Sequence, residues 1–230
     1  AAALLGGGHP MRPGEACLAH HGVLFLDELP EFSRDALEAL REPLESGIVV
    51  VSRARRRWEF PARFQLVAAM NPCPCGFHGD ARRRCHCSGE QVRRYRGKLS
   101  GPLLDRIDIH LQMHPLTPEQ LLHRQGPAGE SSATVAQRVA AARERQLARQ
   151  GRLNAHLSAR DLKVHCALER GGEALMAAAA ARLGLSARGF DRILKLARTC
   201  ADLQGEAALS TAHLTEGIAL RALDRAQRED

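Results

Sequence analysis

Short, unbroken apolar runs characterise the first half of the chain. Residues 23–26 read Val-Leu-Phe-Leu, and residues 64–70 are again mostly apolar. Runs of this length without polar alternation are typical of central parallel strands that are buried on both faces. The apolar residues of the segment Ile-Asp-Ile-His-Leu, at 107–111, predict another strand. The pattern therefore predicts a parallel α/β sheet in this half of the chain.

From residue 134 onward, the apolar residues recur at helical spacing instead. The predicted helices cover about residues 134–150, 158–169, 173–184, 186–204 and 210–226. In the fourth, Ser186 is the expected N-cap, and the expected core face is Ile193, Leu196, Ala197, Cys200 and Leu203. We therefore expect an α/β domain at residues 1–116 and a helical domain at 134–228. Residues 117–133 predict a short capped helix and a flexible linker between them.

A cationic turn lies between two β-favouring runs at about residues 48–60. These runs predict a β-hairpin, whose tip carries Arg53, Arg55, Arg56 and Arg57. An arginine-rich tip can bind nucleic-acid phosphates without reading base sequence. A charged tip that only keeps the hairpin soluble explains the same residues equally well.

Polar side chains follow the predicted strands. Asp27 and Glu28 come directly after the first run, and Asn71 follows the second. In open α/β sheets, ligands bind at the carboxyl ends of the strands. Paired carboxylates there suit a magnesium-bound nucleotide, because one supports the metal and the other deprotonates a water. The bare pattern also fits a buried strand that ends in a solvated acidic turn.

The order of these parts resembles that of the AAA+ ATPases with a presensor hairpin, and most closely the magnesium-chelatase-like proteins of the ComM/YifB family. The resemblance covers nearly all 230 residues. The matching segments are Arg-Pro-Gly-Glu at 12–15, Phe-Leu-Asp-Glu-Leu-Pro-Glu-Phe at 25–32, Pro-Ala-Arg-Phe-Gln-Leu-Val-Ala-Ala at 61–69, Asn-Pro-Cys-Pro-Cys-Gly at 71–76, Arg-Tyr-Arg-Gly-Lys-Leu-Ser-Gly-Pro-Leu-Leu-Asp-Arg-Ile-Asp at 94–108 and Ser-Ala-Arg-Gly-Phe-Asp-Arg-Ile-Leu-Lys at 186–195.

This resemblance implies a fold and an activity. The fold is a AAA+ P-loop NTPase core, incomplete at its N-terminus, followed by an α-helical lid domain. The activity is ATP hydrolysis by a homo-oligomeric ring, expected to be a hexamer, coupled to movement on branched or single-stranded DNA. Such a motor would drive branch migration in the recombination of incoming DNA during natural transformation. The hairpin at 48–60 would then project into the central pore of the ring.

The resemblance also implies roles for single residues. Asp27 would support Mg²⁺ in the Mg-ATP site, Glu28 would be the general base, and Asn71 would position the attacking water. Arg106 would act in trans as an arginine finger, and Arg188 would be the lid's sensor of the γ-phosphate. An ion pair with Asp105 or Asp108 is the simpler alternative for Arg106, and a surface arginine is the alternative for Arg188.

One part of such an ATPase is not found in the sequence. The phosphate-binding pattern Gly-x-x-x-x-Gly-Lys-Ser/Thr does not occur in the 230 residues. The glycines at 6–8 precede His9 and Pro10, with no lysine, and proline has no amide to donate. The resemblance places the phosphate loop upstream of residue 1. We therefore expect this chain to be the carboxyl-terminal part of a longer protein and to be inactive alone.

The seven cysteines fall into two groups. Four of them form two Cys-x-Cys pairs within a Gly-, Pro- and Arg-rich loop at 72–90, and they are Cys73, Cys75, Cys85 and Cys87. Four thiolates in one loop suit a structural Zn²⁺, although His78 or His86 could replace a ligand. The other three are expected to be small buried apolar residues: Cys17, Cys166 and Cys200.

A net charge of +7 favours an anionic partner such as DNA, although solvated helix faces produce the same composition. No segment has the character of a signal peptide or a membrane span, so we expect a cytoplasmic protein with no membrane partner.

Two other functions fit the sequence. One is a magnesium-chelatase-like ATPase that remodels a protein partner for metal insertion, and the other is a non-catalytic truncated fragment.

Overall fold

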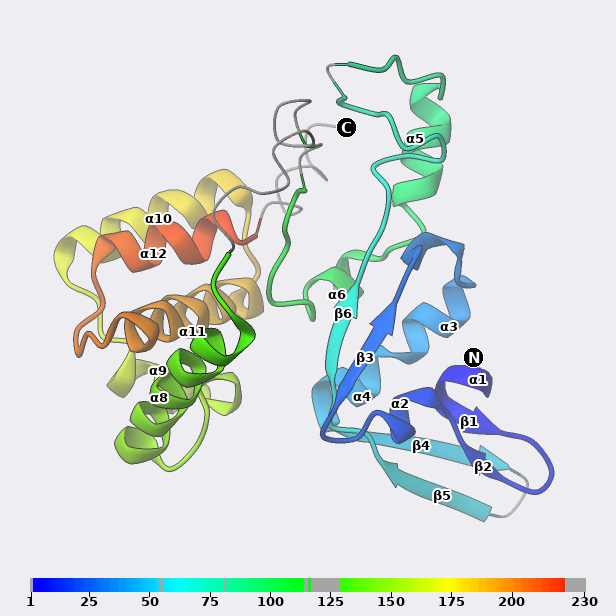
Figure 1. Ribbon diagram of the computed structural model, residues 1–230, viewed down its shortest axis with the longest axis horizontal. Helices are drawn as coiled ribbons and strands as arrows, with labels where there is room; N and C mark the ends of the chain where they lie inside the picture. The colour runs from blue at the N-terminus through cyan, green and yellow to red at the C-terminus, as the bar shows by residue number, and fades with distance from the viewer. Residues whose placement is uncertain (1, 54–55, 81, 114–115, 117–128, 222–230) are drawn as a thin grey trace. The chain divides into compact units, whose positions relative to one another are not determined.

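The computed structural model describes residues 2–53, 56–80, 82–113, 116 and 129–221 (Figure 1). The chain forms two compact units, an α/β unit at Ala1–Ile107 and a helical unit at Asp108–Asp230. The first unit thus ends before residue 116, where the sequence suggested a domain end. Most of the predicted linker, at 117–128, and the end of the last predicted helix, at 222–226, lie outside the described residues.

Six strands of the α/β unit pair two by two in the described part of the chain. Antiparallel pairs join β1 (Gly6–Gly7) to β2 (Arg12–Pro13) and β4 (Ile48–Arg53) to β5 (Arg56–Pro61), and a parallel pair joins β3 (Val23–Leu26) to β6 (Gln65–Ala68). The helices are α1 (Ala2–Leu5), α2 (Glu15–Leu18), η1 (Leu29–Glu31), α3 (Arg34–Ala39), α4 (Arg41–Ser46), α5 (Gly89–Arg96) and α6 (Gly101–Leu104).

Strand β3 is buried on one face only. Leu24 and Leu26 are 7% and 4% exposed, whereas Val23 and Phe25 are 61% and 59% exposed. Alternate residues of a strand point to opposite faces, and only one face of the β3–β6 pair is covered in the described structure. The prediction that this run is buried on both faces is therefore wrong for this structure, although the predicted strand and its parallel pairing are confirmed.

The predicted strand at 107–111 is wrong. Among the described residues, this segment makes only an isolated parallel bridge, between His110 and Arg221, in which the His110 amide donates to the Leu220 carbonyl at 2.6 Å. Ile109 and Leu111 are 45% and 69% exposed. A strand needs a continuous ladder with a neighbour, and one bridge does not provide it.

The helical unit packs around a continuous apolar core. Its elements are α8 (Ser132–Gln150), η2 (Asn154–His156), α9 (Ala159–His165), α10 (Arg170–Leu183), α11 (Ala187–Gln204) and α12 (Thr211–Ala219). Helix α11 contacts α8, α9 and α12, and it runs through the middle of the unit (Figure 1). Among the described residues, no helix is both long enough and apolar enough to cross a membrane.

The predictions for α11 largely agree with the structure. The Ser186 side chain accepts a hydrogen bond from the Gly189 amide and caps the helix, as predicted. Ile193 and Ala197 are fully buried, but Leu203 is 36% exposed and does not belong to the core face. The helix predicted at 158–169 is too long, because α9 ends at His165 and α10 begins at Arg170.

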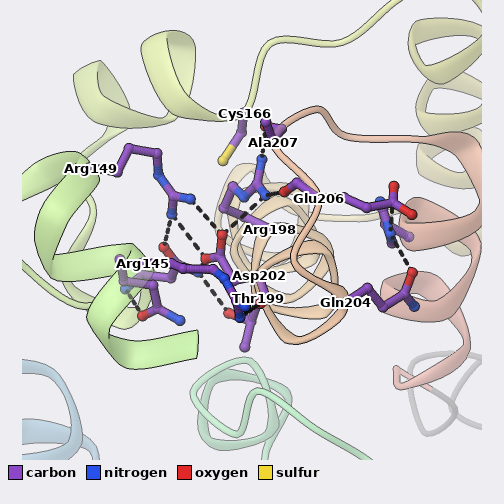
Figure 2. Close-up of polar contacts among 12 residues, drawn as sticks. Arg145, Arg149, Cys166, Arg198, Thr199, Asp202, Gln204, Glu206 and Ala207 are labelled. Atoms are coloured by element: carbon purple, nitrogen blue, oxygen red, sulfur yellow. Dashed lines mark hydrogen bonds and ion pairs between the residues drawn. The ribbon is translucent and has the colours of Figure 1, made fainter. Parts of the chain in front are cut away.

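A buried polar network, which the sequence did not predict, joins α8 to α11 (Figure 2). The Asp202 side chain is 1% exposed and accepts hydrogen bonds from Arg149 Nη2 at 2.9 Å and Asn154 Nδ2 at 2.8 Å. Arg198, also 1% exposed, approaches Asp202 at 3.1 Å and donates to the Ala207 carbonyl at 2.7 Å. Burial alone would raise the pKa of Asp202, but the hydrogen bonds from Arg149 and Asn154 and the nearby guanidinium charges hold the pKa below its usual value.

Candidate nucleotide and metal sites

Strands β3 and β6 end together, and this brings the chain segments with the predicted polar residues to one edge. Their register pairs Leu26 with Ala68. Beyond the strands, the Ala69 amide donates to the Leu26 carbonyl at 2.9 Å, and the Leu29 amide donates to the Ala69 carbonyl at 2.9 Å. The chain segments carrying Asp27, Glu28 and Asn71 therefore leave the strands at the same carboxyl end. All three residues are exposed and open to a ligand.

Glu28 holds an unusual backbone conformation at this edge. Its φ and ψ are 49° and 47°, in the left-handed region, which costs an ordinary L-residue roughly 1–2 kcal/mol. The Glu28 amide donates to the Asp27 carboxylate at 2.8 Å. This bend ends β3 and starts η1, so that the two carboxylates stand at a sharp turn.

Helix α5 supports the segment that carries Asn71. Tyr95 is 7% exposed. Burial and the charge of Glu31 raise the Tyr95 pKa, while a hydrogen bond from the Asn71 backbone partly opposes the rise. Arg96 Nε donates to the Pro72 carbonyl at 3.1 Å. Sequence reasoning did not assign Tyr95 a role, although it is the only tyrosine in the chain and lies within the Arg-Tyr-Arg-Gly-Lys segment.

Arg106 follows α6 and is engaged within its own unit. Its side chain is 8% exposed, it forms an ion pair with Glu45 of α4, and its Nη1 donates to the Pro102 carbonyl at 2.7 Å. Asp108, one of the two partners considered from sequence, pairs instead with Arg192. The sequence offered no signal for Glu45, which is 61 residues away. Action of Arg106 in trans stays a prediction.

Arg188 belongs to the helical unit. It lies in the first turn of α11, just after the Ser186 cap, and it is exposed. A basic residue at a helix N-terminus opposes the helix dipole, so Arg188 gives α11 no support through the dipole. Its role as a phosphate sensor stays a prediction.

The predicted hairpin is confirmed as a fold element. Strands β4 and β5 pair antiparallel from Ile48 opposite Pro61 to Arg53 opposite Arg56. Arg56 and Arg57 are exposed, and Arg57 pairs with Glu59 at 2.9 Å. Exposed ion pairs of this kind contribute little stability, so Glu59 leaves Arg57 available. Arg55 and the side chain of Arg53 lie outside the described residues.

The four clustered cysteines converge on one point. The Sγ atoms of Cys73 and Cys75 are 3.4 Å apart, those of Cys75 and Cys85 are 3.5 Å apart, and those of Cys73 and Cys85 are 3.7 Å apart. With Cys87 included, all four sulfur atoms lie within 4.8 Å of one another. A tetrahedral zinc with Zn–S bonds of about 2.3 Å requires sulfur atoms about 3.8 Å apart. The four thiols therefore fit a structural zinc.

Backbone amides also favour a charged sulfur in this cluster. Hydrogen bonds from the amides of Phe77 and His86 lower the pKa of Cys75 to about 6, whereas burial raises the pKa of Cys87 to about 12. Neighbouring thiolates repel one another, so they do not readily ionise together. A divalent cation between them offsets this repulsion. Within the described residues, the metal-ligating group consists of the four cysteines, and neither His78 nor His86 belongs to it.

The other three cysteines match their expected role to different degrees. Cys166 and Cys200 are 3% and 8% exposed, and burial raises the pKa of each to about 11. Cys17 is only partly buried. Neutral thiols in apolar surroundings are inert, so we assign these residues to packing.

Comparison with known proteins gives matches along almost the whole chain. The family described as magnesium chelatase, subunit ChlI, matches residues 1–121, and its C-terminal counterpart matches residues 129–221. YifB of Escherichia coli (strain K12) is 50% identical over 223 residues, which cover 97% of this chain and 44% of YifB.

Two further relatives show the same coverage. Competence protein ComM of Haemophilus influenzae (strain Rd) is 48% identical over 223 residues, 97% of this chain and 43% of ComM. Rv2897c of Mycobacterium tuberculosis (strain H37Rv) is 44% identical over 225 residues, 96% of this chain and 44% of that relative. The chain thus spans less than half the length of the relatives it matches.

Proposed function

Because the chain belongs to the magnesium chelatase subunit ChlI family, we propose that it is part of a AAA+ ATPase that acts on DNA. The name of the relative ComM connects that protein with competence. The corresponding role here is branch migration, powered by ATP, during recombination of incoming DNA. The α/β unit is the AAA+ core of this motor, the helical unit is its lid, and the working assembly is a hexameric ring.

One observation carries the ATPase proposal. Parallel pairing of β3 and β6 places Asp27, Glu28 and Asn71 at one edge, exposed and at the carboxyl end of both strands. With Mg-ATP bound, Asp27 would hold the metal, Glu28 would accept a proton from water, and Asn71 would orient that water. The bent backbone at Glu28 and the hydrogen bond between the Asn71 backbone and Tyr95 support this proposal.

Two arginines complete the proposed site. Arg106 exchanges its ion pair with Glu45 for the nucleotide of the neighbouring subunit, where its charge stabilises the transition state. Arg188 senses the γ-phosphate from the lid. The Cys73, Cys75, Cys85 and Cys87 thiolates hold a structural zinc that orders the loop between β6 and α5.

The decisive experiment replaces the proposed base in the complete protein. Glu28→Gln should reduce ATP hydrolysis by roughly 10²- to 10⁴-fold, because the amide cannot accept the water proton, while ATP binding persists. Glu31→Gln is the matched control, since Glu31 is an exposed carboxylate three residues away that pairs only loosely with Lys98 at 3.8 Å. The measurements are steady-state phosphate release and equilibrium binding of a fluorescent ATP analogue.

The outcomes of this pair of variants are distinct. Hydrolysis near the wild-type rate in Glu28→Gln would refute the assignment of the base. An equal loss in Glu31→Gln would show that the effect comes from acidic charge around η1 and not from one catalytic group.

A second function is favoured by the description of the matching family, which names a magnesium chelatase subunit. In that case the ATPase would remodel a protein partner for metal insertion. The two functions differ in their response to DNA. A DNA motor should hydrolyse ATP faster when DNA is added, and Arg56→Ala with Arg57→Ala should remove this stimulation while basal hydrolysis remains. A rate that is indifferent to DNA would favour the chelatase-like function.

A further inference from the structure

The positive charge of the chain is concentrated around its cysteine cluster. Residues 72–98, which we call the cysteine lobe, hold seven Arg or Lys residues and two acidic ones. Their formal net charge is +5, out of +7 for the whole chain, so the remaining 203 residues carry only +2. With four thiolates and a divalent zinc, the lobe still carries +3. A solvated surface of average composition does not explain this concentration.

Three consecutive arginines of the lobe are held at both ends. At one end, the Asp80 carboxylate accepts hydrogen bonds from the amides of Arg82 and Arg83, at 2.6 Å and 3.2 Å. At the other end, Arg84 is followed directly by the metal-ligating Cys85. The three arginines are exposed, and the Arg83 guanidinium lies over the Phe77 ring, 5.1 Å from its centre. Arginines on an anchored backbone lose less conformational entropy on binding than those of a loose tail do.

Helix α5 adds further exposed arginines to the lobe. It begins immediately after the last cysteine with a capping box, in which Ser88 and Gln91 bond to each other's backbone amides. Val92 and Tyr95 point inward and are buried, which leaves Arg93 and Arg94 exposed on the other side. The loop runs beside this helix (Figure 1).

From this geometry we infer that the cysteine lobe binds the sugar-phosphate backbone of DNA. It would be a second DNA-binding surface, separate from the β4–β5 hairpin. The contacting residues are Arg82, Arg83, Arg84, Arg93 and Arg94. Their guanidinium groups suit phosphate oxygens, and no base-reading element is needed. The inference rests on the proposed action on DNA and adds the part of the protein that holds the strand. A metal bound by the four cysteines would order the loop that carries Arg82, Arg83 and Arg84.

The test measures DNA binding by the zinc-loaded chain as a function of salt. The probe is a short fluorescent oligothymidylate, followed by fluorescence anisotropy. Replacing Arg82, Arg83 and Arg84 with alanine should lower the slope of log affinity against log salt by about 2, because three phosphate contacts are lost. Affinity at physiological ionic strength should fall roughly tenfold or more. The same three positions changed to lysine should retain most of the binding, because the charges remain.

A matched control removes equal charge elsewhere. Arg160, Arg170 and Arg182 are exposed arginines of the helical unit, and their triple alanine variant should bind almost as tightly as wild type. Zinc content near one equivalent in the Arg82, Arg83 and Arg84 variant would show that the lobe is intact. Equal losses in the two triple variants would overturn the inference in favour of net charge alone.

The hairpin separates this inference from the proposed function. If Arg56→Ala with Arg57→Ala weakens DNA binding while the lobe variant binds like wild type, the lobe surface is refuted and the DNA motor stands. If the unaltered chain and the complete protein both fail to bind DNA, the two proposals fall together.

Discussion

The helical unit and the cysteine lobe use the same residue type in opposite ways. In the helical unit, Arg198 is buried to 1% exposure against Asp202 and serves the interior. In the lobe, the arginines from 82 to 84 are exposed around a core that contains little more than Cys73, Val92 and Tyr95. A buried guanidinium is costly unless an opposite charge lies beside it. An exposed guanidinium is solvated by water and needs only a folded backbone to hold its position. On our proposal, the basic residues of this chain divide into a structural group and a group that binds DNA.

The two regions also differ in what makes them fold. The helical unit buries thirteen apolar or cysteine side chains in one cluster, including Met176, Ile193 and Ala197 at 0% exposure. A core of this kind needs no ligand. The lobe has too few buried side chains to order its loop, and a metal held by its four thiols would supply the missing constraint. Each region should therefore fail under a different perturbation.

Removal of the metal should produce the largest effect, and only in the lobe. Cys75→Ser with Cys85→Ser should abolish binding of about one zinc per chain, an interaction worth on the order of 10 kcal/mol in small zinc domains. Amide protection of α5 should then be lost while α11 stays protected. Elemental analysis and hydrogen exchange measure the two changes. Cys17→Ser is the control and should retain zinc.

Two outcomes would contradict this prediction. Wild-type protein prepared without chelators that contains well under half an equivalent of zinc would remove the basis of the comparison. Loss of protection in α11 together with α5 would show that the helical unit is not independent of the metal.

Opening the buried network should have the next largest effect, and only in the helical unit. Asp202→Asn removes the charge that faces Arg149 and Arg198, and leaving the buried Arg198 without an opposite charge costs about 3–5 kcal/mol. Urea denaturation followed by circular dichroism measures the loss, and zinc content should not change. Asp191→Asn, also on α11 but only partly buried, should shift stability by less than about 0.5 kcal/mol. Equal midpoints for Asp202→Asn and wild type would refute a structural role for the network.

The effect of pH on the stability of the helical unit should be smaller, and it should come from the Asp202 carboxylate. The folded-state pKa of Asp202 lies below its usual value of 3.8. Its contribution is therefore complete above the unfolded pKa and is lost as pH falls through the folded pKa. Stability of the helical unit should decline below about pH 3.8, and Asp202→Asn should flatten this decline. Denaturation midpoints at pH 5, 4 and 3 test it, and parallel curves for the two proteins would contradict it.

Local patterns made several features predictable from the sequence. The hairpin at 48–60, the Ser186 cap and the cysteine cluster each depend on residues that are close in the chain. A turn between β-favouring runs, a cap before an amphipathic helix and two Cys-x-Cys pairs carry their own geometry. These parts of the fold and of the candidate sites could be derived before the structure.

Features that depend on distant partners could not be derived in this way. The ion pair of Arg106 with Glu45 and the network of Asp202 with Arg149 join residues 61 and 53 positions apart. Periodicity carries no information about such pairs. The exposed face of β3 and the missing strand at 107–111 have a similar cause, since an apolar run records what can be buried and not which neighbours cover it.

The left-handed backbone of Glu28 has a consequence for protein redesign. Glycine adopts φ and ψ near 49° and 47° without strain, so it would make this turn more stable than glutamate does. Glutamate therefore occupies a position where the backbone conformation alone would favour glycine. A redesign guided by stability alone would place glycine at residue 28. It would thereby remove the carboxylate that we propose as the general base.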